Sequence, residues 1–224
     1  MTRVHDMGGR YGDGAVLPED NAVFAEDWHA RALALTLACG ALGQWNIDSS
    51  RHARECLSPK DYTRFSYYEK WISALADLLV TQDMLTIEEL RSSRAAGLSD
   101  LAHKALKACD VAAALARGGP SARDSQVVLK FAVGDRVRAR RPARNVIVTG
   151  GHTRLPAYIA GAEGTVVLCH GAHVLPDSNG HYLGEAPEPL YAVSFASDAL
   201  WGKGSIGGDD EVVADLWQSY LEAL

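Results

Sequence analysis

The stretch VVLKFAVGDRVRAR (127–140) marks the point where the hydrophobic pattern of the chain changes. Val133-Gly134-Asp135 is a turn signal, and Val137 then alternates with arginines at the two-residue period of a strand. GTVVLCHG, LYAVSF and EVVADLW are further short apolar runs, separated by glycine, proline, aspartate and asparagine. Several short strands with closely spaced turns predict a small barrel of SH3-like type over 126–224.

The first half of the chain instead has apolar residues at helical spacing. VFAEDWHARALALTLA predicts a helix over 23–38. LSPKDYTRFSYYEKWISALADLLVTQ (57–82) is the strongest helical signal, with Ser58 as its N-cap. SDLAHKALKACDVAAALARGG predicts a third long helix, from a cap at Ser99 to a stop at Gly118.

A capping box, Thr86 with Glu89, opens one more short helix between these segments. The first residues are glycine-rich and polar, which is typical of an extended arm. The sequence therefore predicts an α+β chain with three parts: an extended N-terminal arm (1–22), a helical domain (23–120) and a C-terminal SH3-like β-barrel (126–224).

Composition narrows the classes of function. The 224 residues are 47% hydrophobic, with a net charge of −6, and this acidic total argues against nucleic acid as the main partner. The four cysteines lie far apart without a CxxC pair, so no metal site is expected in this chain. No apolar run approaches a membrane span, and MTRVHDMGGRYGDG lacks the apolar core of a secretion signal, so we expect a cytoplasmic protein without membrane contact.

Four motifs allow a functional and a structural interpretation. GGRYGDG (8–14) resembles a phosphate loop only loosely, and RVRARRPAR (136–144) fits either a nucleic-acid patch or a solvated strand face. His52 and Cys56 stand at helical spacing, but no orienting acid or oxyanion donor accompanies them. HGAHVLPDSNGH (170–181) has three histidines that match no standard metal spacing. The structural interpretation is favoured for all four.

A fifth stretch, GGHTRLPAYIAGAEGTV (150–166), places Arg154 in a turn-rich loop. Taken alone, it is a surface charge. Together with VHDMGG, RHARE, SYYEKWISALADLLV, LTIEEL, FAVGDRVR, HGAHVLPD, LGEAPEPLYAVSF and DLWQSYLE, it resembles the β subunit of nitrile hydratase, in the order of that family and over nearly the whole chain. The helical first part and SH3-like second part of that family agree with the pattern above.

The resemblance implies an enzyme that hydrates nitriles to amides as a complex with an α subunit, as an αβ pair or α2β2. The metal of the family, Co(III) or Fe(III), is bound by a CxxCSC loop of the α subunit, and this chain contains no such motif. Two cysteines of that loop are oxidised to sulfenic and sulfinic forms. By motif match, Arg51 and Arg154 are the arginines that hydrogen-bond to their oxygens.

The substrate pocket of the family implies roles for four more residues. Ile47, Tyr67 and Trp71 match positions that line it, and Ser50 stands where the family often carries a bulky aromatic, which predicts a wider pocket. Two other classes remain open. One is an SH3-like module that binds nucleic acid through RVRARRPAR. The other is a subunit of an enzyme related to thiocyanate hydrolase, whose β-like sequence is split over two shorter chains.

Overall fold

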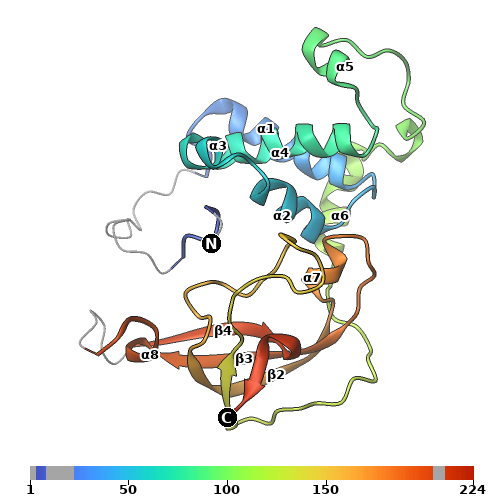
Figure 1. Cartoon of the computed structure of the whole chain (residues 1–224). Helices are drawn as coiled ribbons and strands as arrows, with labels where there is room; N and C mark the ends of the chain where they lie inside the picture. Colours follow the sequence, from blue (N-terminus) through green and yellow to red (C-terminus); the bar gives the residue numbers. More distant parts are fainter. Residues whose placement is uncertain (1–3, 9–22, 204–209) are drawn as a thin grey trace. The chain divides into compact units, whose positions relative to one another are not determined.

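The computed structural model describes residues 4–8, 23–203 and 210–224. It forms two compact units: the described residues of Arg10–Gly119 form helices, and Pro120–Leu224 together with Met1–Gly9 contains a β-sheet. Each unit is described by itself (Figure 1). Most of the predicted arm (1–22) and of GGRYGDG lies outside the described residues.

Helices α1 and α2 of the helical unit both pack against α4. Their buried residues include Ala32 on α1 and Ala74, Leu75 and Leu78 on α4, which recur at one-turn spacing. The elements of this unit, two of which are 3-10 turns (η), are α1 (Asp27–Gly40), α2 (Ile47–Glu55), α3 (Pro59–Arg64), α4 (Tyr67–Thr81), α5 (Ile87–Ser92), η1 (Ala102–Lys104), η2 (Ala108–Asp110) and α6 (Val111–Arg117).

Two predicted caps are confirmed. Ser58 accepts a hydrogen bond from the backbone N–H of Asp61, and Thr86 and Glu89 form the expected capping box. The single helix predicted over 57–82 is wrong, because a second capping box intervenes. Ser66 caps α4, and its N–H donates to Glu69 Oε2 over 2.6 Å, so the chain is extended at Phe65 and restarts as a new helix.

Two other helix predictions need correction. The first helix begins at Asp27 rather than at residue 23, because Glu26 and His29 form a capping box there. The helix predicted from Ser99 to Gly118 is helical only in α6, after the two 3-10 turns. Residues 102–105 and 107–110 are exposed, so a continuous helix there would bury no apolar face to stabilise it.

The sheet unit contains five antiparallel strands in the order β4-β3-β2-β1-β5. These strands are β1 (Arg136–Ala139), β2 (Glu163–His173), β3 (Glu188–Ala196), β4 (Glu211–Trp217) and β5 (Leu221–Ala223). Within the described residues the edge strands β4 and β5 do not pair, so the sheet is open. The closed SH3-like barrel therefore stays a prediction.

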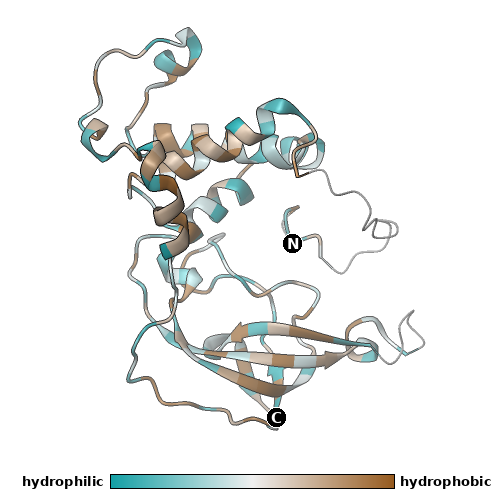
Figure 2. Cartoon of the chain, turned by 180° about the vertical axis from the view of Figure 1, so that it is seen from behind, coloured by the Kyte–Doolittle hydropathy of each residue, from teal (hydrophilic) through white to brown (hydrophobic). Residues whose placement is uncertain are grey.

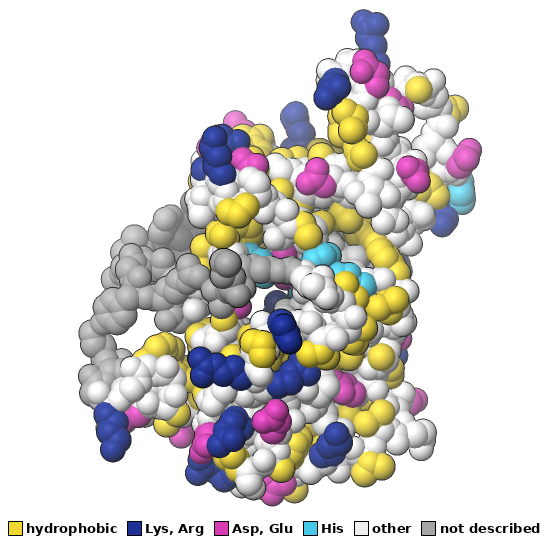
Figure 3. Space-filling view, in the orientation of Figure 1, with side chains coloured by type: hydrophobic (Ala, Val, Ile, Leu, Met, Phe, Trp, Pro, Cys, Tyr) yellow, Lys and Arg dark blue, Asp and Glu magenta, His cyan; other side chains and the backbone are white. Residues whose placement is uncertain are grey.

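The alternation predicted for β1 is confirmed. Val137 and Ala139 are fully buried, while Arg136 and Arg138 are exposed and both pair with Glu163. Alternating hydrophobic and hydrophilic bands run along the strands (Figure 2). Basic and acidic side chains also lie next to each other over this unit (Figure 3). The arginines of this strand thus form a solvated, ion-paired face.

The core of the sheet unit lies on the other side of these strands, and its largest members include Tyr191, Phe195, Leu155, Ile159 and Tyr220. Three short elements complete the unit: α7 (Pro176–Asn179), α8 (Ser197–Trp201) and η3 (Gln218–Tyr220). None of the helices formed by the described residues is long and apolar enough to span a membrane.

Candidate functional site

Arg51 lies on α2, a helix that its sequence caps strongly. The Asn46 side chain accepts hydrogen bonds from the N–H groups of Asp48 and Ser49, at 3.0 and 2.9 Å. One turn further on, Arg51 Nη1 donates to Asp48 Oδ1 over 3.1 Å. Asp48 is 4% exposed, so the ion pair holds one terminal nitrogen of the guanidinium against the helix and leaves part of the group accessible.

Tyr67 and Trp71 lie on α4 four residues apart and form an aromatic face. Their ring centroids are 5.4 Å apart. Tyr67 is 62% exposed and Ile47, at the start of α2, is 61% exposed. Large apolar side chains this exposed mark a surface that can receive an apolar ligand or a partner protein.

Arg54 connects these two helices, and sequence reasoning did not assign it a role. Its Nη1 donates to Ser50 Oγ over 3.3 Å, and its guanidinium carbon lies 4.7 Å from the centre of a Trp71 ring. Burial, followed by the charge of Arg51, lowers the pKa of Arg54. The signal available in the sequence was the helical spacing of residues 47, 50, 51 and 54, which puts all four on one face of α2.

Arg154 lies in the sheet unit, on a loop fixed by a buried tyrosine. The Tyr220 hydroxyl accepts hydrogen bonds from Arg154 N and Thr153 Oγ1, both at 3.2 Å, and donates to Asp177 Oδ2 over 2.6 Å. Tyr220 is fully buried and Asp177 is 2% exposed. Burial raises the pKa of Asp177, and burial followed by the Asp177 charge raises that of Tyr220 well above its usual range.

A second buried side chain, Asn145, holds the start of the same loop. Its Nδ2 donates to the carbonyl oxygens of His152 and Asp177, at 2.6 and 2.8 Å. The N–H of His152 donates to His181 Nε2 over 2.8 Å. The backbone that leads into Arg154 is therefore fixed by Asn145 and by two groups far away in sequence, His181 and Tyr220. The Arg154 side chain itself is exposed and has no acceptor or ion-pair partner within the described part of the chain.

The N-terminal segment of the sheet unit caps the turn that follows this loop. The Asp6 carboxylate accepts from the N–H of Ala157, with oxygen distances of 3.1 and 3.2 Å. Tyr158 stacks on Trp201 with ring centroids 6.4 Å apart. Residues from both ends of the sequence thus support the loop that carries Arg154.

His52 and Cys56 are brought together as their spacing allows, with Cys56 Sγ 3.5 Å from His52 Nε2. His52 Nδ1 also lies 3.5 Å from Glu55 Oε2. The hydrogen bond with Cys56, followed by that with Glu55, raises the pKa of His52 to about 9. Glu55 is thus an acid beside the pair that sequence reasoning did not recognise.

The three histidines of HGAHVLPDSNGH have separate partners. His170 pairs with Asp215 over 2.9 Å, His173 with Ser121 over 3.1 Å, and His181 with the backbone of His152. In residues 4–8, 23–203 and 210–224, no three histidine, cysteine or acidic side chains are grouped to hold a metal ion. A metal therefore has no recognisable ligand set in the described chain.

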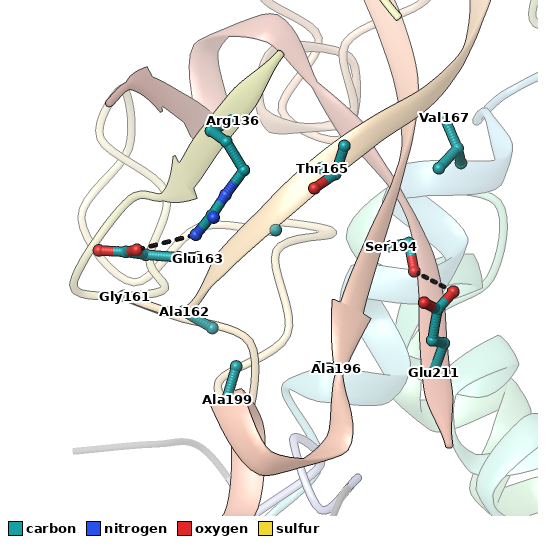
Figure 4. A pocket seen from close by; sticks show the side chains of 11 residues that line it. Arg136, Gly161, Ala162, Glu163, Thr165, Val167, Ser194, Ala196, Ala199 and Glu211 are labelled. Atoms are coloured by element: carbon teal, nitrogen blue, oxygen red, sulfur yellow. Dashed lines mark hydrogen bonds and ion pairs between the residues drawn. The ribbon is translucent and has the colours of Figure 1, made fainter. Parts of the chain in front are cut away.

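A hollow of about 690 Å³ lies on the sheet unit and is bordered by Arg136, Glu163, Thr165, Ser194 and Glu211 (Figure 4). Four of its polar side chains already have partners, because Arg136 forms an ion pair with Glu163 and Ser194 donates a 2.8 Å hydrogen bond to Glu211. It contains none of the predicted site residues. We therefore place the candidate site elsewhere, on the α2–α4 face and on the Arg154 loop.

Helices α2 and α4 of the helical unit carry five predicted site residues and one newly recognised residue, Arg54. The five predicted residues are Ile47, Ser50, Arg51, Tyr67 and Trp71. Arg154 belongs to the other unit. Chemically, the helical face offers aromatic surface and two guanidinium groups, and the loop offers one exposed guanidinium on a rigid backbone. Both regions suit an anion or a polarised small molecule.

Comparisons with known proteins cover both units. The family model "Nitrile hydratase beta subunit, N-terminal" matches residues 1–117, and "Nitrile hydratase beta subunit, C-terminal" matches residues 120–223. Nitrile hydratase subunit beta of Pseudomonas putida is 35% identical over 99% of each chain. Cobalt-containing nitrile hydratase subunit beta of Pseudonocardia thermophila is 33% identical over 99% of this chain and 96% of its own.

Among solved structures, the recombinant apo-enzyme of thiocyanate hydrolase from Thiobacillus thioparus is 24% identical. The match covers 62% of this chain and 98% of that chain, with a TM-score of 0.38.

Proposed function

The chain belongs to the nitrile hydratase β-subunit family, and we propose that Arg51 and Arg154 complete an active site whose metal is held by an α subunit. The enzyme formed with that α subunit is a hydro-lyase that adds water to R–C≡N and gives the amide. Relatives named as cobalt-containing support cobalt or iron as the metal of the complex.

The observation that carries the proposal is the state of Arg154. Its backbone is fixed by Tyr220, while its guanidinium is exposed without an acceptor in the described chain. A rigidly mounted cation of this kind is suited to an anion supplied by another molecule. We propose that this anion is an oxidised cysteine of the α subunit.

Arginine suits this role for physical reasons. Its planar fork donates parallel hydrogen bonds to a sulfenate or sulfinate and keeps its proton at any working pH. Arg51 is oriented by Asp48 and would donate in the same way. Two such cations neutralise an anionic cluster and shield the oxidised sulfurs from further oxidation.

The aromatic face has a different task in the proposed reaction. Tyr67, Trp71 and Ile47 offer an apolar wall for the body of the nitrile, which itself has only one weak, linear acceptor for orientation. The metal, when bound by the partner, acts as a Lewis acid toward the nitrile. This chain then positions the substrate, excludes water from its apolar side and holds the charge of the oxidised cysteines.

The proposal also includes the domain limits of the chain, its assembly and its location in the cell. We place the helical domain at 23–120 and an SH3-like β-barrel domain at 126–224, with an arm over 1–22. We also assign an α2β2 assembly in the cytoplasm. The exposed apolar side chains of the α2–α4 face support a protein partner.

Co-expression tests the assignment. With an α subunit carrying CxxCSC and with cobalt or iron supplied, the complex should hydrate nitriles, and the β chain alone should not. Nitrile hydration by the pure β chain would refute the metal assignment. Hydrolysis of thiocyanate without hydration of nitriles would instead place the chain in the thiocyanate hydrolase class.

Substitution tests the two arginines. Arg51→Lys and Arg154→Lys should each lower kcat by about 100-fold or more, the usual loss when a preorganised donor to charge is removed. The folded state should survive, since each charge is kept. Arg91→Lys, at an exposed position of α5, is the matched control and should keep full turnover. Normal turnover in both site variants would remove the proposed role.

A further inference from the structure

Arg54 lies within the aromatic face, yet the role proposed above does not use it. It donates one hydrogen bond, to Ser50 Oγ at 3.3 Å, and its guanidinium stacks over Trp71. The wall next to Tyr67 and Trp71 is therefore cationic on one side.

The charged side chains next to Arg54 each contact an oppositely charged group. Arg51 Nη1 lies 3.1 Å from Asp48 Oδ1, which leaves the rest of its guanidinium accessible, and His52 lies 3.5 Å from Glu55. Arg54 makes no ion pair with any described residue, and one neutral hydrogen bond leaves most of its five N–H donors unused. The partial burial that lowers its pKa makes this unpaired charge costly.

A guanidinium in this state selects its ligand by charge. It stays protonated, because arginine does not lose its proton in proteins, and its fork matches a carboxylate in a bidentate pair. An alkyl nitrile would leave the donors unsatisfied. A nitrile that carries a carboxylate at its far end would satisfy them while its chain lies on the Trp71 ring.

We propose that Arg54 is a substrate-binding residue that makes the enzyme prefer cyanocarboxylates over neutral nitriles. This inference rests on the proposed function of the α2–α4 face. Arg51 and Arg54 are three residues apart, or roughly 4.5 Å along the helix axis. Since Arg51 marks the part of the face next to the proposed active site, a carboxylate bound at Arg54 would be separated from the nitrile by a short spacer, as in 3-cyanopropanoate.

The test compares three substrates of equal shape in the αβ complex. These are 3-cyanopropanoate, its neutral polar analogue 3-cyanopropanamide, and its apolar analogue 4-methylpentanenitrile. Wild type should show the highest kcat/KM with the carboxylate. Arg54→Leu should lower kcat/KM for the carboxylate by about 10- to 100-fold, the range for a hydrogen bond to a charged group, through KM. It should leave the apolar nitrile unchanged or improved.

Two further variants separate binding from structure. Arg54→Lys keeps the charge but loses the fork, so its preference should lie between wild type and Arg54→Leu. Arg54→Glu should reverse the preference toward the cationic 4-aminobutanenitrile. Arg64→Leu is the matched control, because Arg64 also lies over an aromatic ring, that of Phe65 at 4.9 Å, but outside this face. It should leave all substrate ratios as in wild type.

The outcomes are distinguishable. If Arg54→Leu lowers all three kcat/KM values equally, Arg54 acts only in packing and the inference is overturned. If wild type does not favour the carboxylate and Arg54→Leu weakens the αβ complex, a carboxylate of the α subunit is its partner instead, which also overturns it. In both cases the neutral nitrile is still hydrated, so the proposed function survives. Failure to hydrate any nitrile would remove both.

Discussion

The α2–α4 face and the Arg154 loop each present an arginine, Arg51 and Arg154, and they hold it by different means. Arg51 depends on a capped helix and one neighbouring aspartate three residues away. Arg154 depends on Tyr220 and, through Asp177 and Asn145, on side chains more than 30 residues away from one another. A helix orients a side chain locally, whereas an irregular loop needs buried polar partners to do so. Substitutions in the Arg154 loop should therefore lower the stability of the fold, whereas substitutions on the α2–α4 face should lower activity only.

The sharpest test of this difference is a pair of truncations. Leu155→Ala, beside Arg154 and 2% exposed, should lower the free energy of unfolding by about 2–5 kcal/mol because it leaves a cavity in the core. Ile47→Ala, at a position 61% exposed, should change it by less than about 1 kcal/mol. Amide hydrogen exchange, read separately for each unit, measures both. Equal loss of stability in the two variants would contradict the difference between the loop and the α2–α4 face.

A smaller effect is expected for the Tyr220 hydroxyl. Tyr220→Phe removes the acceptor of Arg154 N and the donor to Asp177, and should cost about 1–3 kcal/mol for the buried groups left unsatisfied. Because Arg154 then loses its anchor, kcat should fall as well.

Tyr191→Phe is the matched control for that variant. Tyr191 is also fully buried, and its hydroxyl donates to Gln218 Oε1 over 3.0 Å without touching the Arg154 loop. Its loss should reduce stability while kcat is kept. A normal kcat for Tyr220→Phe would show that the network stabilises the fold but does not position the arginine.

The smallest predicted effect is a pH-dependent change in the stability of the helical unit. The pKa of His52 is raised from 6.5 to about 9, chiefly by Cys56 and then by Glu55, so folding favours the imidazolium. This contribution is complete below pH 6.5 and is lost as the pH rises through about 9. The stability advantage of wild type over His52→Gln should therefore be present at pH 6 and absent near pH 10.

Urea unfolding at pH 6 and near pH 10, monitored through amide hydrogen exchange in α2, measures the stability advantage of wild type. Cys56→Ser replaces the partner that raises the pKa most, and should shrink the pH dependence. An advantage of His52 that grows with pH would contradict the assignment of the charged form. His52 lies in the helical unit, whereas the Arg154 loop belongs to the sheet unit. The titration of His52 should therefore not change the stability of that loop.

Sequence reasoning succeeded where structure is local. Ser58 and Thr86 are caps because their hydroxyls satisfy N–H groups within three residues. Val137 is buried between two exposed arginines because a strand has a period of two. Ser66 carried the same kind of local signal, with Glu69 three residues later, but the strong apolar pattern around it concealed the start of a new helix.

Sequence reasoning failed where burial in the core determines which structure forms. The helix expected after Ser99 has good local propensity but covers no core, so only α6 forms beyond the 3-10 turns. The site shows the same division. The resemblance to nitrile hydratase β subunits directed attention to Arg51, Arg154 and the Tyr67–Trp71 face, whereas Tyr220 and Asp177 carried no sequence signal of contact with Arg154.

The sequence by itself therefore determined the family, the strand and helix periods, and the helix caps, because each depends on neighbouring residues or on motifs in order. Only the tertiary structure decided what holds Arg154 and what surrounds Arg54. Tyr220 reaches Arg154 across 66 positions, and Trp71 reaches Arg54 from another helix. Such contacts arise from packing and from the need to satisfy buried polar groups, and neither is written into the order of adjacent residues.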